Sequence, residues 1–129
     1  VLRWPNRLFD EEMRVEHWTN AAEQGAAAAR NLLAVSSGDE SEPYAPVPFF
    51  WSDQFDIRVQ FLGRSSPEDD VHVAAGSVAD GKFLALYRTG DKLHGALGVN
   101  APRWVMKMRG SLAAGASWDD ALAVAESFE

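Results

Sequence analysis

The side chains that could carry chemistry are few and lie far apart in the sequence. His17, His72 and His94 have no histidine or carboxylate partner at the spacing of a metal-ligand set. We therefore expect no metal site, and we interpret His72 and His94 as solvent-facing strand residues. No G-x-S-x-G motif supports a serine nucleophile, and neither a G-x-G-x-x-G fingerprint nor a phosphate-cradling loop is present. The sequence alone thus contains no self-sufficient catalytic motif.

The residue types in two stretches are not explained by the formation of a core alone. In "FFWSDQ", residues 49–54, three aromatic residues adjoin Asp53 and Gln54, and this junction could face a core, a partner or a cofactor. In "RVEHWTNA", His17 and Trp18 immediately precede a predicted helix. A helix N-terminus offers backbone N–H groups and a partial positive charge, which suit an anionic or electron-rich edge of a ligand. The alternative is that Trp18 packs against its own helix as a hydrophobic staple.

The first element that must position these residues is a helix. Residues 1–10 contain proline and asparagine and predict an extended loop. Asn20, followed three residues later by Glu23, predicts the N-cap of a helix rich in alanine. Gly25 inside this helix costs up to about 1 kcal/mol relative to alanine. That cost is explained if another group approaches the helix closely.

The second part of the chain has the pattern of an antiparallel sheet. Polar and apolar residues alternate from Phe55 to Phe61, as in a half-buried strand. Asp80-Gly81 and Gly90-Asp91 predict tight turns. The acidic, proline-punctuated stretch 36–48 is interpreted as a linker. We therefore predict an α+β fold: a separate N-terminal helix, then a meander of about four strands with two C-terminal helices on one face. The other predicted elements are strands at 71–78, 82–88 and 92–99, and helices beginning near Pro102 and Ser117.

Composition excludes several classes of protein. Of the 129 residues 47% are hydrophobic, which suffices for a core, and the net charge of -7 disfavours non-specific binding to nucleic acid or anionic membranes. The sequence has no cysteine and no apolar run of the length a membrane helix needs. We expect a cytoplasmic protein without disulfides or iron–sulfur ligands of its own. Because the sequence begins with Val1, we also expect a piece of a longer protein.

Three stretches together have a recognisable pattern: "MRVEHWTNAAEQGAAAARNLL", "PYAPVPFFWSDQFDIRVQFLG" and "KFLALYRTGDKLHGALGVNAPRWVMKMRGSLAAG". They resemble the FAD-dependent NAD(P)H:ferredoxin or rubredoxin reductases, the oxygenase-coupled group that includes apoptosis-inducing factor. The resemblance implies that residues 1–35 end an FAD-binding domain, that 36–48 form a linker, and that 49–129 form the reductase C-terminal domain. The glycine fingerprints of the complete family members are absent from this sequence. Independent FAD binding and activity of this chain are therefore not expected.

The resemblance also implies functional residues. His17 and Trp18 match the segment beside the isoalloxazine ring of FAD, and Trp51, with Phe50 as a weaker candidate, matches an aromatic contact from the C-terminal domain. The implied reaction passes electrons from NAD(P)H through FAD to an iron–sulfur protein such as ferredoxin. Because the cofactor carries this chemistry, no acid–base or nucleophilic side chain is required.

Two partner surfaces are suggested by charge and by composition. Arg103 and Lys107 lie four residues apart on one helix face and could dock ferredoxins, which are usually acidic. The alternative is an ordinary solvated face with Trp104 and Met108 turned into the core. A different interpretation of the whole chain is a non-catalytic interaction module, which forms a homodimer through the alanine-rich N-terminal helix.

Overall fold

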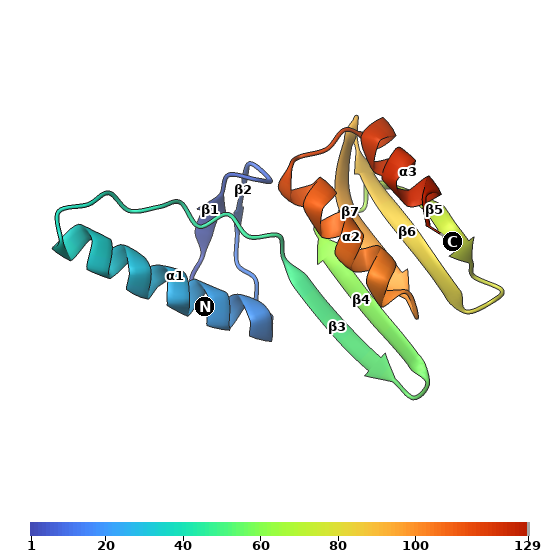
Figure 1. Ribbon diagram of the computed structural model, residues 1–129, viewed down its shortest axis with the longest axis horizontal. Coiled ribbons are helices and arrows are strands. Elements are labelled where there is room, and N and C mark those ends of the chain that lie inside the picture. The colour runs from blue at the N-terminus through green and yellow to red at the C-terminus, as the bar shows by residue number, and fades with distance from the viewer. Residues whose placement is uncertain (129) are drawn as a thin grey trace. The chain divides into compact units, whose positions relative to one another are not determined.

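The computed structural model describes residues 1–128, and the chain divides into two compact units, Val1–Pro48 and Phe49–Glu129 (Figure 1). The first unit contains two short strands, β1 (Trp4–Asn6) and β2 (Glu11–Met13), which pair antiparallel, and one long helix, α1 (Trp18–Ser36). The expectation of a loop over residues 1–10 is wrong, because β1 and β2 pair with each other as a small ribbon.

The N-cap of α1 lies three residues before the predicted one. Its N-cap is His17, whose backbone is extended (φ −95°, ψ 148°), so the prediction of Asn20 as N-cap is wrong. Asn20 lies inside the helix with 4% of its surface exposed. Its amide donates to the Val15 carbonyl at 2.8 Å and accepts from the Tyr44 hydroxyl at 3.0 Å. The side chain therefore fixes neighbouring segments instead of capping a helix end.

One face of α1 holds two other backbone segments through side-chain amides. Gln24 accepts from the backbone N–H of Leu2 at 2.7 Å and donates to its carbonyl at 3.4 Å. Asn31 likewise accepts from the N–H of Glu42 and donates to its carbonyl, both at 2.9 Å. Because Gln24 and Asn31 are seven residues apart, they lie on the same helix face. Each amide thus pairs with a peptide group as a neighbouring strand would.

The second unit is a five-stranded antiparallel sheet with two helices (Figure 1). The predicted α+β fold is confirmed: an antiparallel sheet with two C-terminal helices follows a separate N-terminal helix. The strand order is β3-β4-β7-β6-β5, which differs from the order of a simple meander. The last strand of the chain inserts between β4 and β6, and the first strand, β3, was not predicted. The strands are β3 (Phe49–Gln54), β4 (Ile57–Gly63), β5 (Asp70–Ser77), β6 (Lys82–Thr89) and β7 (Lys92–Val99).

The strands β3 and β4 form a hairpin whose loop contains Phe55 and Asp56, since Gln54 pairs with Ile57. Phe55 was expected inside a strand, but it lies at the tip with φ 58° and a fully exposed side chain. A bulky residue with positive φ is uncommon, and this explains why alternation alone placed the strand start wrongly.

The core of the second unit lies between one face of the sheet and the helices α2 (Pro102–Ala113) and α3 (Trp118–Glu126). Helix α2 packs on β4 and β7, and α3 packs on β5 and β7. The approach is close at Gly98, where an added methyl group would overlap the side chain of Val105. No described helix has both the length and the apolar character to cross a membrane. Residues with 0% exposure in this core are Leu62, Leu84, Leu86, Ala96, Val105, Met108, Ala121 and Ala125.

Candidate functional site

The N-terminus of α1 presents His17 and Trp18, the first pair of predicted site residues. Ala21 donates its N–H to the His17 carbonyl at 3.0 Å, which closes the first helical turn. The first turn of α1 contains no acidic side chain, so the partial positive charge of the helix end is not offset there. An anionic or electron-rich ligand edge would be stabilised at this position.

Trp18 does not pack against its own helix. Its side chain is 77% exposed, whereas a hydrophobic staple would be covered by the first turns of the helix. The staple interpretation is therefore wrong for the described chain. An exposed indole beside a helix N-terminus offers both an aromatic surface and an electropositive edge.

The second predicted pair, Phe50 and Trp51, lies on the edge strand β3. Because consecutive strand residues point to opposite faces, the two side chains do not form one continuous surface. Phe50 contacts Phe61 with ring centroids 5.7 Å apart, and Trp51 stacks on Phe49 at 5.8 Å. Phe50 is 38% and Trp51 40% exposed, so both rings retain surface for a ligand or a partner.

The helix α2 carries the predicted partner-binding residues Arg103 and Lys107, and both are exposed. The predicted alternative is correct for Met108, which is fully buried. Trp104 is only half-buried, with its ring stacked on that of Phe128. A pocket of about 300 Å³ is lined by Lys82, Asn100, Ala101, Pro102, Arg103 and Trp104. Sequence analysis missed Lys82 and Phe128, since no local pattern connects them with α2.

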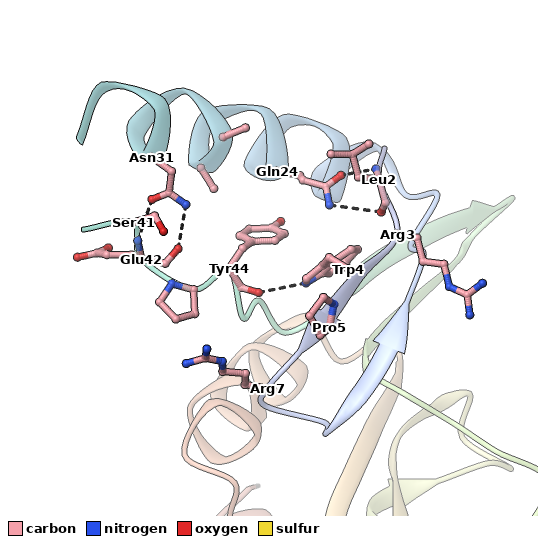
Figure 2. Close-up of a pocket in the computed structure, with 13 residues that line it drawn as sticks. Leu2, Arg3, Trp4, Pro5, Arg7, Gln24, Asn31, Ser41, Glu42 and Tyr44 are labelled. Atoms are coloured by element: carbon pink, nitrogen blue, oxygen red, sulfur yellow. Dashed lines mark hydrogen bonds between the residues drawn. The ribbon is translucent and has the colours of Figure 1, made fainter. Parts of the chain in front are cut away.

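A larger cavity of about 400 Å³ lies within the first unit, along the amide-bearing face of α1 (Figure 2). Trp4 and Tyr44 line it next to each other with ring centroids 5.4 Å apart, and the Trp4 indole donates to the Tyr44 carbonyl at 3.1 Å. Burial raises the pKa of Tyr44 to about 12, with the charge of Glu23 adding to the shift. The Tyr44 hydroxyl therefore stays protonated at neutral pH as the donor to Asn20.

A buried carboxylate in the second unit was also missed. The Asp69 side chain has 0% exposure and accepts from His94 Nδ1 at 2.8 Å, so His94 is not the solvent-facing residue that was expected. Burial alone would raise the pKa of Asp69, but hydrogen bonds from Thr89, His94 and Ser66 outweigh burial and lower it. His72 is exposed, as expected, with its ring 6.2 Å from that of Trp118. Within residues 1–128, no three potential metal ligands gather.

The family model described as Reductase C-terminal matches residues 49–129, which is more than half of the chain. The chain belongs to the Reductase C-terminal family. The matched residues include every strand of the five-stranded sheet, both α2 and α3, and the predicted site residues Phe50, Trp51, Arg103 and Lys107. The resemblance inferred from the sequence is thereby confirmed.

Relatives of this Reductase C-terminal chain extend the likeness into the first unit. It is 36% identical over 115 residues, 88% of its length, to the ferredoxin–NAD(+) reductase component of the anthranilate 1,2-dioxygenase system of Burkholderia cepacia. It is 32% identical over 114 residues, also 88% of its length, to human apoptosis-inducing factor 3. The chain spans only 27% and 17% of these relatives.

A solved structure agrees with this placement. The crystal structure of the covalent putidaredoxin reductase–putidaredoxin complex matches 88% of this Reductase C-terminal chain with a TM-score of 0.72 and 30% identity. The chain covers 26% of that structure's matched chain. At this identity the likeness concerns the family as well as the fold.

Proposed function

We propose that this chain forms part of an FAD-dependent ferredoxin reductase of the cytoplasm, which passes electrons from NAD(P)H to an iron–sulfur protein. Support comes from relatives that are named as reductases of ferredoxin, putidaredoxin and rhodocoxin. Within the chain, the observation that carries the proposal is the exposed indole of Trp18 at the N-terminus of α1. Because the chain spans only 27% and 17% of two of its relatives, we propose that the complete activity also needs further domains.

The residues of the first unit fit FAD in their chemistry. The electropositive end of α1 suits the pyrimidine edge of the isoalloxazine ring, on which the reduced cofactor carries negative charge. His17 and Trp18 would contact that edge, and the indole offers an apolar surface to a planar ring. In the second unit, Trp51 is proposed as a further aromatic contact, with Phe50 as the weaker candidate.

Bound FAD would supply the acceptance of a hydride and the release of single electrons. The chain's own residues would bind the ring, exclude water from it with aromatic side chains, and favour its reduced form through the field of α1. None of these roles needs a nucleophile or a general base.

On the second unit, we propose that Arg103 and Lys107 contact the iron–sulfur protein. Both cations are exposed on the same face of α2, and α2 has no acidic residue. Complementary charge would speed the encounter with an acidic carrier. The matched crystal structure holds putidaredoxin reductase in a covalent complex with putidaredoxin, so that reductase docks a protein partner directly.

The flavin assignment is tested with the purified chain and added FAD. The chain should be colourless as isolated, because its sequence lacks the glycine fingerprints that hold the dinucleotide. It should not bind added FAD tightly, whereas the complete reductase should, and Trp18→Ala in the complete reductase should weaken FAD binding or shift the reduction potential of the flavin. Val35→Ala, an exposed side chain of the same helix, is the matched control. A complete reductase whose FAD affinity and flavin reduction potential are both unchanged by Trp18→Ala would contradict the role of Trp18.

A second function, homodimerisation through α1, is favoured by exposed leucines on the parts of the helix surface that Gln24 and Asn31 do not occupy. Leu32 and Leu33 are 72% and 68% exposed on α1. Apart from its two chain neighbours and the backbone of its own helix, no described atom lies within 4 Å of a methyl group added at Gly25. A second copy of α1 could therefore approach this face closely.

A further inference from the structure

An aromatic stack on the second unit holds two lysines from different elements. The rings of Trp104 and Phe128 lie 6.2 Å apart, with only 11° between their planes. Lys82 Nζ, at the start of β6, lies 4.6 Å from the centroid of a Trp104 ring. Lys107 Nζ, on α2, lies 4.9 Å from the centroid of Phe128. Both distances are within the range of cation–π attraction.

These lysines and Arg103 form a group of cations that we name the basic cluster: Lys82, Arg103 and Lys107. Lys82 and Arg103 line the same pocket of about 300 Å³, of which Trp104 is also a wall. No ion pair between described residues neutralises any of the three. A concentration of positive charge on a chain of net charge -7 is a feature that electrostatic recognition would use.

We propose that Trp104 and Phe128 are positioning residues that preorder the basic cluster for docking an acidic iron–sulfur protein, with Lys82 as a third contact residue. This proposal deepens the proposed docking on α2 and rests on it. A carboxylate side chain of the partner would occupy the pocket lined by Lys82 and Arg103. The charge complementarity of three gathered cations with an acidic surface supports this occupant.

The stack matters because lysine side chains are flexible. A free ammonium group samples many rotamers, and ordering it on docking opposes association. A ring under the ammonium group favours one region of space before the partner arrives, while the outer side of the cation remains available to it. Phe128 therefore acts through Lys107 and through Trp104 without having to touch the partner.

The positions of the lysines are tested without any partner. Ring currents of Trp104 and Phe128 should shift the NMR signals of the Lys82 and Lys107 methylene protons upfield. Phe128→Leu should move the Lys107 signals to the values of an unstacked lysine, and Phe128→Tyr should retain the shift. Lys92, an exposed lysine at the start of β7, is the internal control. Unshifted Lys82 and Lys107 signals in the unmodified chain would overturn the positioning role.

Docking is tested with putidaredoxin as the probe, by titration of the full chain at two salt concentrations. Lys82→Met should weaken binding by about threefold to tenfold and reduce its salt dependence, whereas Lys92→Met should change neither. Phe128→Leu should weaken binding although it removes no charge, and Phe128→Tyr should restore it. If Phe128→Leu binds as tightly as the unmodified chain, the stack is not a positioning device.

The two tests separate the two proposals. Ring-current shifts together with an absence of putidaredoxin binding would refute docking at the basic cluster and leave the stack as a structural feature only. Binding that depends on Arg103 and Lys107 but not on Lys82 or Phe128 would retain the proposed function and overturn the further inference.

Discussion

Individual exposed aromatic residues carry most of the functional interpretation of this molecule. Trp18 and Trp51 retain 77% and 40% of their surface, whereas Trp118 is only 9% exposed, at the start of α3. The exposure of Trp18 and Trp51 leaves both rings available to a ligand or partner, which is the role that the resemblance implies for them. Trp118 serves the core.

Trp51→Ala should leave the sheet folded, because Trp51 lies on an edge strand and is 40% exposed. We expect the free energy of unfolding to fall by about 1–2 kcal/mol, through loss of the partly buried surface of Trp51 and of the aromatic pair with Phe49. Leu62→Ala, at a fully buried position, should cost about 2–5 kcal/mol. Urea titration measures both. A loss for Trp51→Ala as large as that for Leu62→Ala would identify Trp51 as a core residue.

Asp69 should make the stability of the second unit depend on acid pH. Its pKa is lowered in the folded protein by hydrogen bonds from Thr89, His94 and Ser66, which outweigh the opposing effect of burial. The stabilisation is therefore complete above the pKa of the unfolded chain, which is about 3.9, and is lost as the pH falls through the folded value. Urea titrations from about pH 6 to about pH 2 should show this loss, and Asp69→Asn should flatten the curve. Asp56→Asn, in the exposed hairpin loop, should retain the slope of the unmodified chain.

Two glycines show how closely neighbouring elements approach α1 and β7. Gly25 on α1 has open space where a Cβ would lie, whereas Gly98 on β7 lies directly beneath Val105 of α2. A glycine inside a helix is unfavourable unless a neighbour requires the space, and the described chain contains no such neighbour for Gly25.

Gly25→Ala should therefore stabilise the isolated chain by about 0.5–1 kcal/mol, while Gly98→Ala should destabilise it by about 1–3 kcal/mol through overpacking. Thermal unfolding followed by circular dichroism measures both. Combining Gly98→Ala with Val105→Ala should recover part of the loss, since the added methyl group then has room. A destabilising Gly25→Ala would mean that this face of α1 is already covered in solution.

Local patterns predicted the elements that alternate or carry strong turns, and missed those decided by distant contacts. Asp80-Gly81 and Gly90-Asp91 located the turns between β5, β6 and β7. The strand β3 was missed because "FFWSDQ" does not alternate between polar and apolar residues. The turn after it was missed because Phe55 has a positive φ, a conformation usually indicated by glycine or asparagine. The insertion of β7 between β4 and β6 is a long-range pairing that no local signal encodes.

The candidate site was predictable to the same extent. The resemblance located His17, Trp18 and Trp51, and the exposure of the two indoles agrees with a contact role without testing it. Lys82 and Phe128 could not be found, because they are 22 and 24 residues from Trp104 in sequence. Their contacts arise only when β6 and the segment after α3 meet α2.

In each unit, one face of the main element packs against the rest of the unit and another part of its surface is exposed to solvent. In the first unit, Gln24 and Asn31 bind one face of α1 to the segments around Leu2 and Glu42 through hydrogen bonds. In the second unit, α2 and α3 commit one face of the sheet to the core. The open face of α1, with Leu32 and Leu33, is then available for association with another surface.

In the purified chain, this face should drive weak self-association through α1. One helix face buries less than the roughly 800 Å² per partner of a stable interface, so we expect a dissociation constant on the order of tens of micromolar. Sedimentation velocity over a range of concentrations should show a monomer–dimer equilibrium that Leu32→Glu and Leu33→Glu shift to monomer. Val78→Glu replaces an equally exposed apolar residue of the second unit and should leave the equilibrium unchanged. A chain that stays monomeric at high concentration, or a Val78→Glu variant that dissociates as readily, would rule out α1 as the dimer interface.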